Sequence, residues 1–441
     1  MKVRDLNRHD VDPAKWIDLQ VTEWESKSVT NLNIPKRDDG KEYCVDSLYP
    51  DQQEIVAVVL NTLREFLECD DLKQFVPLRL TIVGQGGSGK SVVINTIVAV
   101  MRSMFNCNQV VKVMAPTGTA AYNVGGETIH HMLRVGVSSS SDRKLNQSTR
   151  KALISKFEIL LALIIDERSM VSSNTLGCAE DSISKTIYGG GHMSTKSFGG
   201  LPIVILVGDD FQLPSIGEGA LTALYNRNCS RLTNLGRQTF LECSENVLKL
   251  SSSKRLSDDA KEEKELMSRL RDPENLRDDD INRLLKLDLR NVQEIHGQDI
   301  VDVIRSKAIY LFFKNSKRIH HNLVKLNEDS GPDNPVAVVR SYGDSTVSAV
   351  SNRSHFDSKM PGSAMLCCGC TVALSCRNIH PQWGLHNGAS GTVDEIVFAK
   401  GDSPNNGDDP LYVVVDFPNY RGPIWDKNNP TVSYSCQITT T

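Results

Sequence analysis

Short hydrophobic runs alternate with helix-length segments along the first half of the chain. Four such runs each end in a polar or glycine-rich turn: Leu78–Val83, Val110–Met114, Ile159–Ile165 and Leu201–Val207. Buried strands that alternate with helices are typical of a parallel α/β sheet. Ligands of such sheets bind at the carboxyl ends of the strands, so the residues that follow these runs are the candidates for chemistry.

A helix is predicted before the first strand, over Asp51–Glu68. Its apolar residues recur at helical spacing, and Pro50 stands at its start, where proline is tolerated. Residues 1–45 are polar and are interpreted as a leader or linker. Residues 251–300 are highly charged and are interpreted as helices with mostly solvated faces.

The pattern changes again from about residue 364. Short β-like runs with glycine turns predict a small β module there: Thr371–Ser375, Gly391–Val397 and Leu411–Phe417. We therefore divide the chain into 1–45, an α/β domain at 46–250 with a small insertion near 123–150, a segment at 251–363 and the β module at 364–441.

Composition is that of an ordinary globular protein, with 39% hydrophobic and 24% charged residues among 441. No apolar run approaches the ~20 residues that span a bilayer, and the N-terminus offers no apolar signal region, so an intracellular protein without a membrane partner is expected. The net charge of −4 means that any nucleic-acid groove must be a local feature.

The eleven cysteines are scattered and odd in number, which indicates reduced thiols. One cluster invites a zinc interpretation: Cys367, Cys368, Cys370 and Cys376. A structural zinc site uses two well-separated ligand pairs, whereas three of these cysteines crowd into four positions. Buried or idle thiols are therefore the preferred interpretation.

The first predicted strand is followed by a phosphate-binding pattern. Its residues, Gly84-Gln85-Gly86-Gly87-Ser88-Gly89-Lys90-Ser91, fit G-x-x-x-x-G-K-[ST]. The glycines let backbone N–H groups wrap phosphates, Lys90 supplies a positive charge, and Ser91 supplies a hydroxyl for Mg²⁺. The strand–loop–helix context favours this over an ordinary glycine-rich turn, so ATP and Mg²⁺ are the expected cofactors.

Two later strands end in polar residues of the right kind. Asp166 and Glu167 follow the third run, where they suit Mg²⁺ anchoring and water activation, although alone such a pair is often a surface turn. The fourth run leads into Gly208-Asp209-Asp210-Phe211-Gln212, and a glutamine there could detect the γ-phosphate. Spacing alone does not reject a plain Gly-Asp turn.

Five blocks in this order resemble the superfamily-one helicases of the petite-integration-frequency (Pif-one) type. They are Gly84–Ser91, Ala115–Ala121, Gly125–His130, Asp166–Met170 and Gly208–Pro214. Helitron transposon helicases and RecD-like enzymes share much of the series. Flanking matches, including Leu48–Gln52 and Leu250–Arg255, extend the resemblance from about residue 48 to about 422.

The resemblance implies a P-loop NTPase fold: a RecA-like parallel-sheet motor domain, a partial second RecA-like domain at 251–363, and the start of an SH3-like β module. It also implies ATP-dependent 5′-to-3′ DNA unwinding in DNA repair, recombination and telomere maintenance. The expected partner is single-stranded or tailed duplex DNA. The expected compartment is the nucleus, with the mitochondrion as the alternative.

Carried over by position, the resemblance assigns roles to individual residues. Gln52 would read adenine, Lys90 and Ser91 would hold phosphate and Mg²⁺, and Arg255 would act as an arginine finger. Asp166 and Glu167 would serve catalysis and Gln212 would sense the γ-phosphate. Single-strand contacts would fall near Pro116, Thr117, Gly118 and His130. Each of two residues has an alternative. Arg255 could lie on a solvated helix face, and His130 could be a core or loop histidine.

The sequence departs from the family at several places. Arg168 stands where an apolar residue is usual, and Asp210 where an aromatic is common. The family's terminal His-Lys-x-Gln-Gly and Ala-Leu-Ser-Arg-like motifs are not found before Thr441, so we expect a chain that binds ATP without unwinding DNA. Two other readings stay open: a non-catalytic, transposon-derived remnant, and a P-loop enzyme that acts on a small molecule or on GTP, although no Asn-Lys-x-Asp motif occurs.

Overall fold

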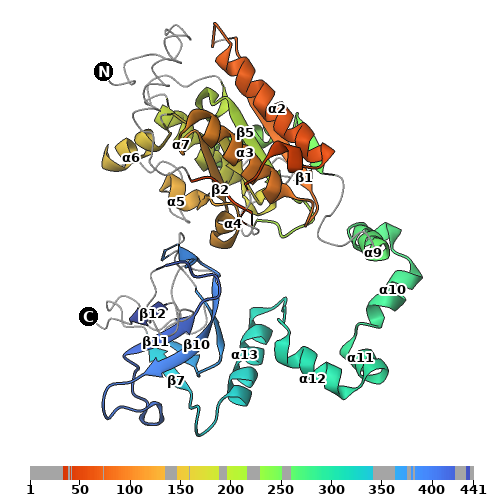
Figure 1. The fold of residues 1–441 in the computed structure, drawn as a ribbon, viewed down its shortest axis with the longest axis vertical. Coiled ribbons are helices and arrows are strands. Elements are labelled where there is room, and N and C mark those ends of the chain that lie inside the picture. Colours follow the sequence, from red (N-terminus) through yellow and green to blue (C-terminus); the bar gives the residue numbers. More distant parts are fainter. Residues whose placement is uncertain are drawn as a thin grey trace. The chain divides into compact units, whose positions relative to one another are not determined.

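In the computed structural model the chain forms two compact units, unit 1 (Met1–Arg271) and unit 2 (Asp272–Thr441), whose elements are labelled in Figure 1. The described residues are 33–37, 40, 42–72, 74–134, 147–157, 159–187, 196–215, 229–250, 260–340, 363–374, 379–380, 383–422 and 434–437. No helix among them is long and apolar enough to cross a membrane.

Unit 1 is built on a six-stranded sheet in the order β3-β2-β4-β5-β1-β6, with every pairing parallel. Its strands are β1 (Leu78–Gly84), β2 (Val111–Ala115), β3 (Glu127–Thr128), β4 (Ala162–Ile165), β5 (Ile203–Gly208) and β6 (Val247–Leu250). The four strands and the parallel sheet expected from the hydrophobic runs are confirmed. Residues 127–128 add a short strand at the sheet edge, beside β2.

The two-residue period of the strands divides their side chains between two cores. In β4, Ala162 and Ile164 pack into one buried cluster, whereas Leu163 and Ile165 pack into another on the opposite face. Both faces of the sheet are therefore covered, which explains why the central strands β4 and β5 are hydrophobic throughout.

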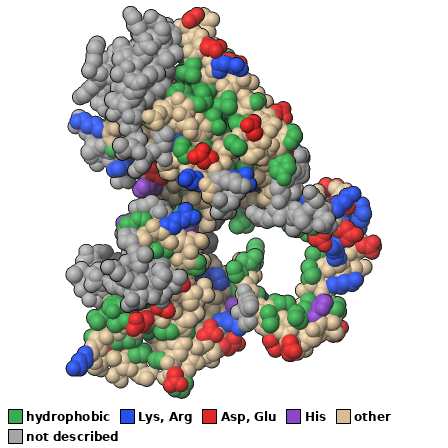
Figure 2. All heavy atoms as spheres, viewed as in Figure 1, with side chains coloured by type: hydrophobic (Ala, Val, Ile, Leu, Met, Phe, Trp, Pro, Cys, Tyr) green, Lys and Arg blue, Asp and Glu red, His purple; other side chains and the backbone are tan. Residues whose placement is uncertain are grey.

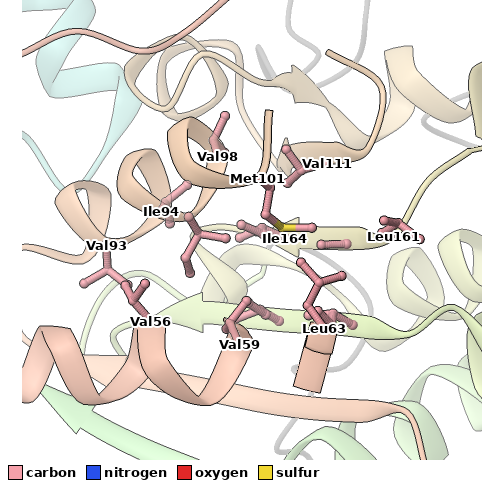
Figure 3. Close-up of a cluster of buried hydrophobic side chains, with 14 of the residues drawn as sticks. Val56, Val59, Leu63, Val93, Ile94, Val98, Met101, Val111, Leu161 and Ile164 are labelled. Carbon is pink, nitrogen blue, oxygen red and sulfur yellow. The ribbon is translucent and has the colours of Figure 1, made fainter. Parts of the chain in front are cut away.

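Helices α2 (Pro50–Leu67) and α3 (Lys90–Phe105) cover the first face. Figure 3 shows Val59 and Leu63 of α2 facing the side chains of α3 and of the sheet around Ile164. The observed bounds of α2 confirm the helix predicted from the spacing of its apolar residues.

The second face is covered by α5 (Ile129–Leu133), α6 (Gln147–Phe157), α7 (Ser173–Ile187) and α8 (Arg231–Cys243). Helices α7 and α8 approach closely through two glycines. A Cβ on Gly177 would lie 1.8 Å from the carbonyl oxygen of Leu232, and one on Gly236 would lie 1.8 Å from that of Ser173. Unit 1 also contains α9 (Lys261–Leu270) and shorter helical segments, which are α4 (Gly118–Asn123) and the 3-10 turns η2 (Val45–Ser47), η3 (Arg168–Met170) and η4 (Ser197–Gly200).

Unit 2 begins with helices whose apolar residues are largely exposed. They are α10 (Asp278–Leu285), α11 (Leu289–His296), α12 (Gln298–Lys307) and α13 (Asn315–Asp329). Hydrophobic side chains show at the surface along this helical segment (Figure 2), and Leu285, Leu287 and Ile295 are each more than half exposed. The segment between α12 and α13 exposes Ile309, Leu311 and Phe313 almost fully.

The rest of unit 2 is β structure. A two-stranded antiparallel ladder joins β7 (Ala337–Arg340) to β8 (Ser363–Leu366). An antiparallel sheet in the order β12-β11-β10-β9 contains β9 (Thr371–Ala373), β10 (Ser390–Val397), β11 (Tyr412–Asp416) and β12 (Tyr434–Gln437). The short strands expected after residue 364 are confirmed, and they enclose a small core around Leu385, Val393 and Val415.

Candidate active site

The carboxyl ends of the parallel strands place the expected functional residues along one edge of the sheet. His130 follows β3, Pro116 to Gly118 follow β2, the Asp166-Glu167 pair follows β4, Gln212 follows β5, and the phosphate-binding loop follows β1. The strand order therefore puts the acidic pair between the DNA-contact candidates and the loop. Three strand spacings separate β2 from β1, roughly 14 Å.

The phosphate-binding loop folds around its own lysine. Gly87 and Gly89 have φ values of +82° and +88°, which only glycine adopts readily. Lys90 begins α3, and its Nζ donates to the carbonyl oxygens of Gly84 at 2.7 Å and Gln85 at 3.1 Å. The ammonium is thus held at the centre of the loop.

Lys90 is a buried cation without a counter-ion at contact distance. Its residue is 8% exposed, and among the described residues no carboxylate forms an ion pair with Nζ. Burial lowers the pKa of Lys90, and the nearby charge of Arg271 lowers it further, while Asp209, Glu167 and Asp166 act in the opposite sense. A buried ammonium at a helix N-terminus is suited to an anionic phosphate.

The acidic pair at the end of β4 presents carboxylate oxygens to the same region. Asp166 is 5% exposed, and burial raises its pKa to about 6. One oxygen of Asp166 accepts the backbone N–H of Glu167 at 2.9 Å. Glu167 has a left-handed backbone, φ +50°, and its Oε2 is buried without a hydrogen-bond partner in the described part of the chain. A partnerless buried carboxylate oxygen can accept a water or a cation.

The turn after β5 touches the phosphate-binding loop directly. Asp209 is 2% exposed, and its Oδ2 accepts the backbone N–H of Gly86 at 3.1 Å. The backbone N–H of Gln212 donates to the Asp209 carbonyl at 3.1 Å. The amide nitrogen of the Gln212 side chain lies 4.0 Å from where a Cβ on Gly86 would stand. The structure therefore brings Gln212 beside the loop.

Sequence reasoning missed Arg271. Its guanidinium donates to both carboxylate oxygens of Asp209, at 2.9 Å for Oδ2, and it lies over the Phe211 ring at 4.6 Å. Arg271 follows α9 in the segment expected to have solvated faces. Nothing in the local sequence distinguishes it from the other charges there, because its partner lies 62 residues earlier.

The two departures from the family pattern contact each other. Arg168 and Asp210 form an ion pair at 2.5 Å, and the Arg168 guanidinium lies 5.5 Å from the Phe240 ring centre. Arg168 is almost fully buried, whereas the Asp210 side chain is 45% exposed. A charge at the first position is therefore matched by the opposite charge at the second.

Gln52, on α2, forms a hydrogen bond with the phosphate-binding loop. It is 3% exposed, its amide donates to the Ser88 carbonyl at 3.3 Å, and its Oε1 accepts the Tyr49 backbone N–H at 3.1 Å. A Cβ on Gly89 would stand 2.2 Å from the Gln52 amide nitrogen, so the Gln52 side chain can lie here only because residue 89 is glycine. The adenine-reading role of Gln52 stays a prediction.

The structure describes the residues expected to contact DNA, but it does not describe Arg255. Thr117 caps α4, accepting the Ala120 backbone N–H at 3.2 Å. Pro116 and His130 are half-buried, and burial lowers the pKa of His130, so its ring is neutral near pH 7. Arg255 lies outside the described residues.

The donor set fits a magnesium nucleotide. A Cβ on Gly84 would stand 2.4 Å from Ser88 Oγ and 3.0 Å from Leu250 Cβ, so the loop requires glycine there. The exposed Ser91 and the buried Asp166 offer a hydroxyl and a carboxylate to Mg²⁺, which usually takes its other ligands from phosphate and water. No cluster of three or more metal-ligating side chains occurs in the described residues, which include Cys367, Cys368 and Cys370 but not Cys376.

Comparison with known proteins identifies the region that carries this site. Residues 69–281 match the family model of PIF1-like helicases. A segment of 137 residues is 34% identical to the ATP-dependent DNA helicase RRM3 of Saccharomyces cerevisiae. That segment covers 31% of this chain and 18% of RRM3, so the chain spans less than a fifth of this relative's length.

Solved structures agree on the fold. The Pif1 helicase of Candida albicans superimposes with a TM-score of 0.54 at 22% identity, covering 84% of this chain and 75% of that one. The Bacteroides Pif1 helicase in complex with ADP-AlF3 and single-stranded DNA gives 0.52 at 18% identity, covering 85% and 73%. Unit 1 therefore has the α/β, RecA-like fold with a P-loop that was predicted from the sequence.

Proposed function

We propose that this protein hydrolyses ATP and couples hydrolysis to movement on DNA, because residues 69–281 match the family model of PIF1-like helicases and a segment of the chain is similar to a DNA helicase. The observation that carries the proposal is Lys90, a buried cation with no ion-pair partner in the described residues. It lies in a glycine loop whose neighbouring strands present Asp166, Glu167 and Asp209. This arrangement matches the needs of phosphoryl transfer, which relies on positioning and on charge stabilisation.

Each residue has a distinct part in this proposal. Lys90 and the backbone N–H groups of the loop hold the phosphates, and Ser91 and Asp166 hold Mg²⁺, which neutralises phosphate charge when bound. Glu167 orients and deprotonates the attacking water through its unsatisfied Oε2. Gln212, beside Gly86, responds to the γ-phosphate.

DNA is the proposed binding partner. The named relative is a DNA helicase, and the Bacteroides structure contains single-stranded DNA. Residues Pro116 to Gly118 and His130 follow β2 and β3, across the acidic pair from the loop, and are the proposed strand contacts. Tailed duplex as DNA partner, 5′-to-3′ polarity, and roles in repair, recombination and telomere maintenance belong to the same proposal, with the nucleus or mitochondrion as location; duplex unwinding by this chain alone is not part of it.

The test is hydrolysis by Glu167→Gln. Loss of the general base should lower ATP turnover by about 10²–10⁴-fold, while Mg·ATP affinity stays near that of the parent because Lys90 and Asp166 are intact. Turnover is measured by phosphate release with and without a single-stranded oligonucleotide, with the surface variant Glu65→Gln as control. A Glu167→Gln turnover within a few-fold of the parent would place water activation elsewhere.

A further inference from the structure

Asp209 connects three elements of unit 1 that are distant in sequence. Its carboxylate accepts the Gly86 N–H of the phosphate-binding loop at 3.1 Å and the Phe211 N–H at 3.2 Å. Arg271, after α9, donates to both of its oxygens. The main chain of Asp209 also accepts the Gln212 N–H. The position of this one carboxylate therefore sets the spacing between Gly86 and Gln212.

Arg271 is the only cation that forms an ion pair with Asp209 in the described residues. Its guanidinium is fixed from two sides, by the two-pronged contact to the carboxylate and by the Phe211 ring. A planar fork matches a carboxylate in a way that an ammonium cannot. The neighbouring Arg269, by contrast, pairs at 3.5 Å with Glu265 on its own helix.

Without Arg271 the buried Asp209 carboxylate would have no matched charge. Burial acts to raise the pKa of Asp209, but the hydrogen bonds and charge of Arg271, the Phe211 N–H and the charge of Lys90 together outweigh burial, so the pKa is lowered overall. A carboxylate without a matched charge would also repel an incoming phosphate group. Asp209 is close enough to the phosphate-binding lysine for this, since its charge acts to raise the pKa of Lys90.

We propose that Arg271 is a positioning residue for the γ-phosphate end of the nucleotide site. It holds Asp209 against Gly86, keeps Gln212 beside the loop, and neutralises the carboxylate where a third phosphate would arrive. This inference rests on the proposed function, because it presumes that the loop binds a nucleoside triphosphate. Arg271 consequently sets the preference for triphosphate over diphosphate and does not touch the reacting atoms.

The first measurement needs no nucleotide. Hydrogen exchange followed by mass spectrometry on the full chain should show faster exchange at peptides containing Gly86 and Gln212 in Arg271→Ala than in the parent. Arg269→Ala, two residues earlier in the last turn of α9, is the matched control and should leave both peptides unchanged. Arg271→Lys keeps the charge but loses the fork, so it should be intermediate. Unchanged exchange in Arg271→Ala would overturn the positioning role.

The second measurement is the ratio of ATP to ADP affinity by calorimetry. Arg271→Ala removes the charge-assisted hydrogen bonds to Asp209. It should therefore lower the affinity for Mg·ATP by about tenfold, while the affinity for ADP stays within about threefold of the parent's. In an Asp209→Asn background the Arg271→Ala effect should largely disappear, because the charge to be neutralised is gone. Equal weakening of both nucleotides, or additive effects in the double variant, would overturn the inference alone. A parent chain that binds neither nucleotide would overturn the proposed function and, with it, the triphosphate role of Arg271.

Discussion

The two units use their hydrophobic residues in opposite ways. In unit 1 both faces of the parallel sheet are covered, and Ile164 and Phe157 are completely buried. In the helical part of unit 2, helices α11 and α13 contain no buried residue, and Ile309 is 90% exposed. A doubly covered sheet is dense and resists deformation.

This difference explains where chemistry is possible. Every described residue that we assign to nucleotide binding, from Gln52 to Arg271, belongs to unit 1. Among them, Lys90, Asp166 and Asp209 are buried just beyond the ends of strands whose positions the two cores fix. A site for phosphoryl transfer depends on such fixed groups, because they need no rearrangement as charge develops.

The largest expected effect tests the contrast in burial. Ile164→Ala should lower the free energy of unfolding of unit 1 by about 3–4 kcal/mol, because it opens a cavity in a closed core. Ile309→Ala, the same change in unit 2, should cost less than about 0.5 kcal/mol. Urea denaturation followed by hydrogen exchange reports each unit separately. Comparable losses for the two variants would mean that Ile309 is covered in solution.

The second prediction concerns pH and the buried acid of unit 1. Asp166 has its pKa raised from 3.8 to about 6 by burial, so its protonated form stabilises the fold below pH 4 and that stability is lost as the pH rises through 6. Without metal, Asp166→Asn should be more stable than the parent at pH 8, by up to about 3 kcal/mol. The gain should vanish at pH 4.

Urea midpoints between pH 4 and pH 8 measure this dependence. The exposed Asp402 in unit 2 gives the control, since Asp402→Asn should show no difference from the parent at either pH. An Asp166→Asn variant that is less stable than the parent at pH 8 would mean that the carboxylate is satisfied in the free protein.

The third and smallest effect concerns the paired departures Arg168 and Asp210. Asp210→Ala leaves a buried guanidinium without its partner and should destabilise unit 1 by about 1–2 kcal/mol, less than a fully buried pair because Asp210 is half exposed. The double change Arg168→Met with Asp210→Asn should recover most of the loss. In unit 2, Glu328→Ala removes the exposed pair with Lys325 and should leave the unfolding midpoint unchanged. Equal losses in the single and double variants would show that the two residues act independently.

The elements of unit 1 followed from the sequence because local rules determine them. An apolar run as short as Ile159–Ile165 favours a strand buried on both faces over a helix, and the spacing of apolar residues in α2 favours a helix. The observed bounds of these elements differ from the predicted ones by up to three residues. The largest difference is at β4, which begins at Ala162 and not at Ile159.

The site was only partly predictable, for a physical reason. Lys90, Asp166 and Gln212 stand in motifs whose spacing encodes their placement after a strand. Arg271 and Arg168 act through partners 62 and 42 residues away, and no local pattern records such pairings. The departures at positions 168 and 210 were visible in the sequence, and opposite charge at both was the signal that they compensate each other.

We expect unit 1 to bind a magnesium nucleotide through Lys90, and titration calorimetry with Mg·ATP tests this most directly. The parent chain should bind with measurable heat, and Lys90→Ala should weaken binding by at least about 100-fold, because a buried charge that holds phosphate is lost. Lys112→Ala, which removes a half-buried lysine from β2 of the same sheet, should bind as the parent does. Equal Mg·ATP affinity in the parent and in Lys90→Ala would contradict the account.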